Sequence, residues 1–363
     1  MPELIWILIE TLIKAVFILT MILLAAATLV YLERRISAFI QNRYGPNRVG
    51  PFGLLQPFAD VFKLFLKEDL VPKVADKRFH RIAPIISLGV TLAVYSVIPL
   101  SNYFTIDTGE SVRKIYLGIA PNVNIGFLFV LAMTSVGVYG ITLAGWSSNN
   151  KYSLLGGLRS SAQMISYELS MGLSVIGVLL VSNYFTTAPN GSWTNTLSLN
   201  TIVLNQSGWK WNIIFQPLGF LIFLVSAFAE TNRAPFDLPE AEPELVGGFN
   251  TEYSGMKFGM FFLAEYGNMA TSAALITLLF LGGWQLPFPS SWLGLTEGSI
   301  WLALAQFTSF LLKIILLAIF FIWVRWSIPR FRYDQLMNLG WKIMLPLSLL
   351  NIVITGIVLQ FFF

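Results

Sequence analysis

Long runs of apolar residues alternate along the whole chain with short segments that hold most of the charge. A helix that crosses the hydrocarbon core of a bilayer needs about 20 mostly apolar residues. Each of the following segments meets this requirement and is predicted to span the membrane: 4–32, 81–100, 124–146, 159–182, 211–230, 256–281, 300–326 and 340–363. We find no soluble domain and no clear internal repeat. The expected fold is therefore a single all-α polytopic membrane domain over 1–363, with about eight transmembrane helices.

The first apolar run is longer than a membrane requires. A helix from Leu4 to Leu32 would extend about 43 Å at 1.5 Å per residue, whereas the hydrocarbon core is about 30 Å thick. We therefore expect the first helix to be strongly tilted. Glu10 and Lys14 lie near its outer end, at the four-residue spacing that pairs opposite charges on one helical face. We interpret this pair as structural in preference to functional.

A helix of another kind is predicted in the first loop, 33–81. Its large apolar side chains share one helical face, and these are Phe58, Val61, Phe62 and Phe65. Its charged side chains share the other face, and these are Asp60, Lys63 and Lys67. The segment is too short and too charged to cross the bilayer, so we expect it to lie in the interface plane. Two roles stay open for it: an anchor on the membrane surface, or one wall of an opening for a lipid-soluble molecule.

The composition supports a membrane protein and restricts its chemistry. Charged residues make up 12% of the chain, against about 25% in soluble domains. The sequence has no cysteine, which excludes thiolate-bound iron–sulfur clusters, disulfides and cysteine nucleophiles within it. Its single histidine, His80, argues against a haem or zinc site built by this chain. If the protein takes part in redox chemistry, the electron carriers are expected on other subunits.

The distribution of lysine and arginine predicts the orientation. The loops after the odd-numbered spans hold 18 of these residues, while the opposite side has three, Arg113, Lys114 and Lys210. Basic residues concentrate in cytoplasmic loops. We therefore expect the loops 33–81 and 230–256 in the cytoplasm and both termini on the periplasmic side. The N-terminal apolar run is too long for a cleavable signal peptide.

Four carboxylates are predicted at or near membrane depth, on four different helices: Glu33, Glu168, Glu230 and Glu265. Ionisable groups are costly there, and by default they suggest function. A single buried glutamate is equally well explained as a neutral, hydrogen-bonded residue or as half of an ion pair. Four together favour a polar path, because burial and neighbouring carboxylates bring such groups into the range where they exchange protons. Lys313 is a candidate counter-ion.

The loop after the fifth predicted span is strongly acidic. Its sequence is AETNRAPFDLPEAEPELVGGFNTEYSGMKFG, with Arg233 as the one base between Glu230 and Glu252. Pro235, Pro239 and Pro243 prevent a regular helix there. The acids alternate with apolar residues and lie among basic loops. We therefore expect a loop packed into protein in preference to a solvated acidic loop.

Four sequence blocks carry a resemblance to a known family. They are YLERRISAFIQNRYGPNRVGPFGLLQPFADVFKLFLKE, GWSSNNKYSLLGGLRSSAQMISYELSMG, the acidic loop AETNRAPFDLPEAEPELVGGFNTEYSG, and RWSIPRFRYDQLMNLGWK. In their residues and in their order along the chain, these blocks resemble the H-type membrane subunit (mammalian subunit one type) of respiratory complex I, NADH:quinone oxidoreductase. The eight-span layout agrees with this family over the whole chain.

The resemblance implies a subunit that docks the peripheral arm and forms most of a quinone tunnel. The tunnel mouth would lie between the first span, the interfacial helix and the sixth span. Carried onto this chain, the quinone-binding residues are Glu33, Arg34, Arg35, Asp60, Phe62, Asp237 and Phe258. The implied proton path consists of Glu168, Glu230, Glu240, Glu242, Glu244 and Glu265.

The resemblance also implies the surroundings of the chain. Quinone would be the substrate, while FMN and the iron–sulfur clusters would belong to partner subunits, with no metal bound here. The implied partners are peripheral quinone-module subunits, small membrane subunits, antiporter-like subunits and membrane lipid, with no nucleic acid. The expected location is the bacterial inner (plasma) membrane. A polar outer segment, 183–210, is expected to cap the outer face or to contact another subunit.

Three other functions compete with this interpretation. A homologous membrane subunit of a membrane-bound hydrogenase or formate-oxidising complex would keep the fold and lack quinone. A transporter with a glutamate relay would show an inverted repeat with broken helices, which we do not find. A structural anchor would leave the carboxylates unexplained. Two interpretations stay open for the charged residues of the block RWSIPRFRYDQ. They either flank a span on its cytoplasmic side or belong to the junction of the peripheral and membrane arms, and they are Arg325, Arg330, Arg332 and Asp334.

Overall fold

A computed structural model describes residues 2–107, 112–186, 197–208, 210–238, 242–288 and 294–362. Each predicted span contains a helix. These helices are α1 (Pro2–Ile40), α3 (Lys77–Val94), α4 (Gly126–Ser147), α5 (Lys151–Thr186), α8 (Pro217–Glu230), α10 (Gly255–Phe280), α11 (Ile300–Ser327) and α13 (Leu345–Phe362). Among the described residues, five helices are long and apolar enough to cross a membrane, which confirms the all-α polytopic fold.

Shorter elements connect these helices. They are α2 (Gln56–Leu66), α6 (Leu199–Asn205), α7 (Asn212–Phe215), α9 (Glu242–Leu245), α12 (Tyr333–Asn338), two 3₁₀ turns (Pro51–Gly53 and Gly248–Asn250) and a π-helix (Leu339–Met344). The elements that were not predicted from the sequence include an antiparallel hairpin of β1 (Tyr103–Asp107) and β2 (Val112–Tyr116). Tyr103 pairs with Tyr116, and Asp107 pairs with Val112.

Several predicted spans differ in their bounds from the observed helices, including the first span and the span 211–230. The predicted span 211–230 is divided into α7 and α8, because Pro217 restricts the preceding residue and lacks a backbone N–H. Gln216 accordingly has a non-helical φ of −131° and ψ of 54°. The first helix does not end at Leu32 but continues to Ile40. Glu33, Arg34 and Arg35 therefore project from a regular helix, and their directions are fixed by its geometry.

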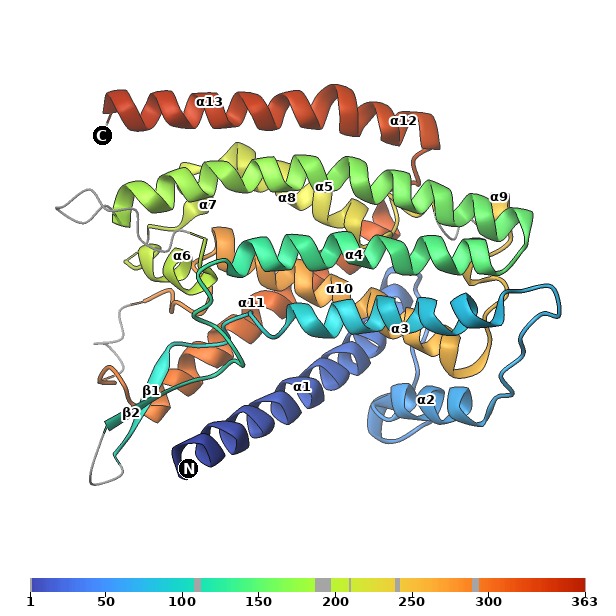
Figure 1. Ribbon diagram of the computed structural model, residues 1–363, viewed down its shortest axis with the longest axis horizontal. Coiled ribbons are helices and arrows are strands. Elements are labelled where there is room, and N and C mark those ends of the chain that lie inside the picture. Colours follow the sequence, from blue (N-terminus) through green and yellow to red (C-terminus); the bar gives the residue numbers. More distant parts are fainter. Residues whose placement is uncertain are drawn as a thin grey trace.

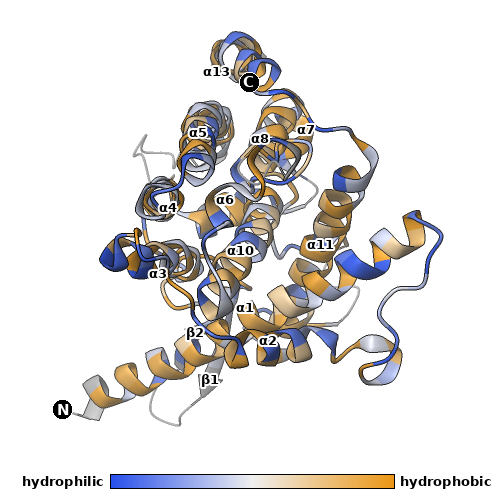
Figure 2. Ribbon diagram, turned by 90° about the vertical axis from the view of Figure 1, so that its right-hand side faces the viewer, coloured by the Kyte–Doolittle hydropathy of each residue, from blue (hydrophilic) through white to orange (hydrophobic). Residues whose placement is uncertain are grey.

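The long helices form a bundle around α10. Figure 1 shows α3, α4, α5 and α13 running nearly parallel, while α1 crosses them obliquely, in keeping with the expected tilt of the first helix. Every residue of α10 from Met269 to Phe280 is buried, and Figure 2 shows this helix surrounded by the others. In contrast, α1 leaves Leu8, Leu12 and Val16 exposed. Apolar residues on the outside and polar contacts within are the arrangement that a bilayer requires.

One end of the bundle carries the segments on which the candidate site depends. Here α1 ends, α3 begins, and the connecting segments 148–150, 231–238, 242–254 and 328–332 lie together (Figure 1). We call this the loop end. The hairpin and α6 lie at the opposite end. The described part of the polar segment 183–210 includes α6, whose Leu199, Ile202 and Val203 are buried within this chain.

Candidate functional site

A buried ionic cluster joins four separate elements near the loop end. Arg233, from the acidic loop, donates from Nη1 to Glu33 of α1 at 2.8 Å and from Nε to Glu265 of α10 at 2.7 Å. Arg325, from the end of α11, also donates to Glu33. The Tyr266 hydroxyl donates to Glu33 at 2.8 Å. These five residues, the Glu33–Arg233 cluster, hold segments that are up to 292 residues apart in the sequence.

Arg233 is the centre of this cluster. Its side chain is only 3% exposed, and its guanidinium carbon lies 4.1 Å from the centroid of the Tyr266 ring. Burial acts to lower the pKa of Arg233, but the carboxylates of Glu265 and Glu33 outweigh burial and raise it. Arginine suits this position, because its planar fork reaches two carboxylates at once. Within the described part of the chain, Nη2 has no hydrogen-bond partner, so one buried donor remains for water or a ligand.

The start of the acidic loop is held against α5, and this contact positions Arg233. Gln163 Nε2 donates to the carbonyls of Ala229 at 2.7 Å and Phe236 at 2.8 Å. Asn232 adopts a left-handed φ of 52°, which asparagine tolerates better than most residues. The loop turns sharply after α8 as a result. The expectation of a loop packed into protein is confirmed for this part, since Phe236 and Leu238 are buried.

Glu168 and Glu230 form a second acidic group, between α4, α5 and α8. Ser135 of α4 donates a short hydrogen bond to Glu168. Glu230 lies within electrostatic range of Glu168, and its Oε2 atom has no hydrogen-bond partner among the described residues. The small neighbours on α5, Ser166, Ser170 and Ser174, are buried, which agrees with close helix contact along this face.

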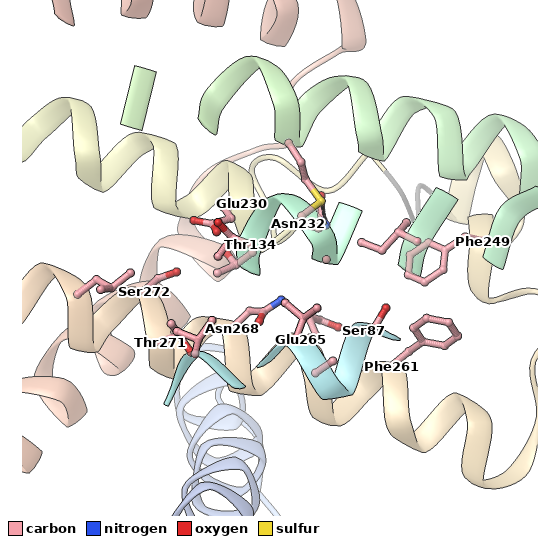
Figure 3. A pocket seen from close by; sticks show the side chains of 18 of the residues that line it. Ser87, Thr134, Glu230, Asn232, Phe249, Phe261, Glu265, Asn268, Thr271 and Ser272 are labelled. Atoms are coloured by element: carbon pink, nitrogen blue, oxygen red, sulfur yellow. Dashed lines mark hydrogen bonds between the residues drawn. The ribbon is translucent and has the colours of Figure 1, made fainter. Parts of the chain in front are cut away.

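A cavity of about 60 Å³ lies between Glu230 and Glu265, and both polar and apolar side chains line it. Figure 3 shows Glu230 and Thr134 on one side of it, with Glu265 and Asn268 on the other. Asn268 accepts a hydrogen bond of 2.8 Å from Thr91. A cavity of this size has room for ordered water beside its polar side chains. Because Glu265 also binds Arg233, the cavity connects the Glu33–Arg233 cluster to the Glu168 and Glu230 group.

At the other side of the cluster, α2 packs against α1 and α10. Arg34 binds Asp60 at 2.6 Å, so Asp60 on α2 points towards α1. The apolar face is open, and Phe62 is 68% exposed. Arg35, the next residue on α1, is exposed, and its guanidinium carbon lies 6.0 Å from the centroid of the Tyr31 ring. The outward aromatic face fits a helix lying at a membrane interface.

An aromatic row on α10 leads from α2 towards the cluster. Phe258 and Phe262 have ring centroids 6.1 Å apart, and Phe262 and Tyr266 have centroids 4.7 Å apart. The four-residue spacing places all three side chains on one face of the helix. Only Phe258 was predicted from the sequence. The same spacing would have identified Phe262 and Tyr266.

Other predicted residues lie apart from the cluster or beyond the described part of the chain. Glu244 is 52% exposed and binds Arg159 at 2.7 Å, with Arg330 at 3.6 Å. Glu240 and the side chain of Glu242 lie outside the described residues. Asp237 is partly buried and lies in the same acidic loop as Arg233. The structure therefore brings together Glu33, Glu265, Glu230 and Glu168, with Arg233 and Tyr266 as additions that were not predicted from the sequence.

Lys313 was wrongly considered a counter-ion for these carboxylates. Its ammonium group donates to the carbonyls of Leu281 at 2.9 Å, Gly283 at 2.9 Å and Gln285 at 2.8 Å. These carbonyls follow the end of α10, where a helix has unsatisfied acceptors and a negative dipole. The Lys313 side chain therefore binds a helix end.

Lys313→Met is expected to destabilise the protein, because buried carbonyls would lose their donor, at a cost of about 1–3 kcal/mol each when unsatisfied. Thermal unfolding in detergent measures the effect, as a lower Tm than that of the unsubstituted protein. Lys313→Arg retains the charge and donors and serves as the matched control, with a smaller loss. Equal Tm values for all three proteins would contradict this role.

The described residues contain no group of three or more histidine, cysteine, aspartate or glutamate side chains arranged to hold a metal ion. The candidate site combines carboxylates, one buried arginine and space for water.

Comparison with known proteins gives a consistent result. A family model described as NADH dehydrogenase matches residues 13–356. The H-type subunit of NADH-quinone oxidoreductase from Salinibacter ruber is 50% identical over 363 residues, covering 98% of this chain and 96% of that protein. NADH-quinone oxidoreductase subunit 8 of Rhodothermus marinus is 51% identical over 350 residues, covering 94% and 95%. One H-type NADH-quinone oxidoreductase subunit of Cytophaga hutchinsonii is 46% identical over 344 residues, covering 95% and 94%.

Proposed function

This chain belongs to the NADH dehydrogenase family, and from that premise we propose that it guides quinone from the bilayer to its site of reduction and couples the reduction to a carboxylate proton path. The observation that carries the proposal is the double contact of Glu265. This residue binds Arg233 at 2.7 Å and also lines the 60 Å³ cavity with Glu230. The Glu265 side chain thus connects the region between α1, α2 and α10 to the carboxylates of Glu230 and Glu168.

The opening for quinone is proposed between α1, α2 and α10. The exposed aromatic face of α2 would meet the apolar part of the bilayer, and Phe262 continues the apolar surface inwards. Arg233 supplies an unused buried donor where this surface ends. The quinone-contacting set is Glu33, Arg34, Arg35, Asp60, Phe62, Asp237 and Phe258, with Phe262 and Tyr266 added.

Coupling is proposed to begin with a change of charge at the quinone site. A reduced quinone takes up protons, and a change of charge beside Arg233 alters how strongly this residue holds Glu33 and Glu265. A weaker hold on Glu265 favours its protonation. Ordered water in the cavity would then carry a proton to Glu230 and on to Glu168, as proton transfer works across one bridging water. Glu240, Glu242 and Glu244 remain proposed members of the path.

The proposed enzyme is a proton-translocating NADH:quinone oxidoreductase, of which this chain is a subunit. Peripheral subunits carrying FMN and iron–sulfur clusters would bind at the loop end, and small membrane and antiporter-like subunits would bind along the bundle. The proposed location is the bacterial inner (plasma) membrane, with both termini periplasmic. The relatives named as quinone oxidoreductase subunits favour this function over the hydrogenase or formate-oxidising alternative.

The quinone contact is tested by photolabelling and kinetics of the purified complex. A photoreactive quinone analogue is expected to label residues 34–67 and α10, and excess quinone should prevent this labelling. Phe262→Ala should raise the quinone KM by about 2- to 10-fold, because an aromatic contact contributes about 0.5–1.5 kcal/mol.

The matched control for this test is Phe361→Ala, which removes an exposed ring at the far end of α13 and should leave the KM unchanged. Labelling confined to other subunits, together with an unchanged KM in Phe262→Ala, would contradict the proposed quinone contact.

A further inference from the structure

The single histidine of the chain, His80, lies in a second polar cluster at the loop end. It belongs to the first turn of α3, and its side chain is fully buried. Its ring stacks on the ring of Tyr253, with centroids 4.0 Å apart and planes inclined by 6°. Its Nε2 atom lies 3.4 Å from the backbone carbonyl oxygen of Glu252, which accepts a hydrogen bond from the N–H of this tautomer. His80 therefore binds the end of the acidic loop.

The end of the acidic loop is also bound to the segment that follows α2. The hydroxyl group of Ser254 accepts a hydrogen bond of 3.0 Å from the backbone N–H of Leu70. The same hydroxyl group donates to the carbonyl of Glu68 at 3.1 Å. Asp69, in the same segment, binds Lys257 in the first turn of α10 at 2.8 Å. These contacts join α2 to the start of α10.

The connection between α4 and α5 binds the loop end from a third side. Ser147 forms a hydrogen bond of 3.2 Å with the hydroxyl group of Tyr253, and Asn150 donates to the Glu252 carboxylate at 2.7 Å. These two contacts are made by neutral side chains that do not titrate. Among the side chains that hold Glu252 and Tyr253 in place, the imidazole is therefore the one that changes its charge near neutral pH.

The environment of His80 favours its neutral form. Its Nδ1 atom has no hydrogen-bond partner among the described residues, so a proton there would be a buried donor without an acceptor. Burial and the ammonium group of Lys257 lower the pKa of His80, although the carboxylates of Asp69 and Glu252 act in the opposite direction. On α3 itself, the Asp76 carboxylate accepts hydrogen bonds from the backbone of the first turn.

From this geometry we propose that His80 is a pH-sensing positioning residue, which holds the end of the acidic loop when neutral and releases it when protonated. A released imidazole is in contact with water, where its pKa is about 6.5. Between about pH 7.5 and about pH 5.5, protonation therefore shifts the equilibrium towards the released loop by up to about tenfold. Release loosens α2 against α10, and its effect on quinone rests on the proposed opening between α1, α2 and α10.

The test compares the full complex at these two pH values. Hydrogen–deuterium exchange of residues 250–256, corrected for the intrinsic exchange rate, should rise by up to about tenfold in acid, and the quinone KM should rise with it. His80→Phe keeps a stacked ring and cannot be protonated, so it should abolish both responses. His80→Gln keeps a donor for the Glu252 carbonyl and does not titrate, so it should abolish them as well.

Tyr253→Phe is the matched control, because it keeps the stacked ring and His80 and removes only the hydroxyl contact with Ser147. It should retain the acid response. Exchange that does not respond to acid in the unsubstituted protein would overturn the proposal, and so would an equal response in His80→Phe and His80→Gln. Exchange that follows these expectations while the KM stays constant would support the role of His80 and contradict the proposed quinone opening.

Discussion

Replacement of Arg233 by glutamine is expected to destabilise the folded protein by about 3–5 kcal/mol, the loss typical of removing one partner from a buried ion pair. The guanidinium is 3% exposed and bridges two carboxylates from different helices. Without it, Glu265 loses its ion-pair partner, and Glu33 retains Arg325 and Tyr266. We expect poor assembly of the complex, measured by native gel, and a lower Tm of the fraction that assembles.

Two variants make this result specific. Arg332→Gln removes an arginine that is 74% exposed and pairs with Asp334, so its cost should stay within about 1 kcal/mol. Arg233→Lys keeps the charge but loses the fork that holds both carboxylates, so it should assemble better than Arg233→Gln and still show low activity. Full assembly and an unchanged Tm in Arg233→Gln would contradict the central position of this residue.

Glu230→Gln is expected to lower NADH:quinone activity and proton pumping at least about tenfold, equivalent to about 1.4 kcal/mol in the barrier, while the complex still assembles. Glutamine keeps the size and polarity of the side chain but does not exchange protons. Glu168→Gln should have the same effect, because the two carboxylates lie within electrostatic range. Activity of the assembled complex in inside-out membrane vesicles, with a pH-sensitive dye, measures both quantities.

Glu297→Gln provides the control for these substitutions. Glu297 is an exposed glutamate that lies outside the helices and does not line the cavity described above, so its replacement should leave activity and pumping unchanged. Normal pumping in both Glu230→Gln and Glu168→Gln would remove these residues from the path.

Patterns with local physical causes were predictable from the sequence. The helices followed from the length of the apolar runs, and the interfacial helix followed from the two faces around Phe62. Glu168 and Glu265 could be predicted as functional candidates, because a carboxylate inside an apolar run is costly. The division between α7 and α8 at Pro217 could also have been predicted, since proline restricts the conformation of the residue before it.

Contacts between distant segments were not predictable in this way. Glu33 and Arg233 are 200 residues apart, and no spacing rule relates them. The sequence could have identified Arg233 as a candidate site residue, because it is the one base in an acidic loop. Its partners could not be identified, because they depend on how α1 and α10 pack. For Lys313 the sequence suggested the wrong kind of partner. Its charge suggested a carboxylate partner, whereas the packing of α10 offered carbonyls.

The quinone site and the acids beyond Glu265 are expected to respond together, and this coupling is central to the proposed function. Redox-induced infrared difference spectroscopy of the complex observes protonated carboxyl groups directly. Reduction of quinone should change a carboxylic C=O band in the unsubstituted protein, and this band should be absent in Glu230→Gln and altered in Glu265→Gln. Spectra that are identical in all three proteins would contradict the coupling.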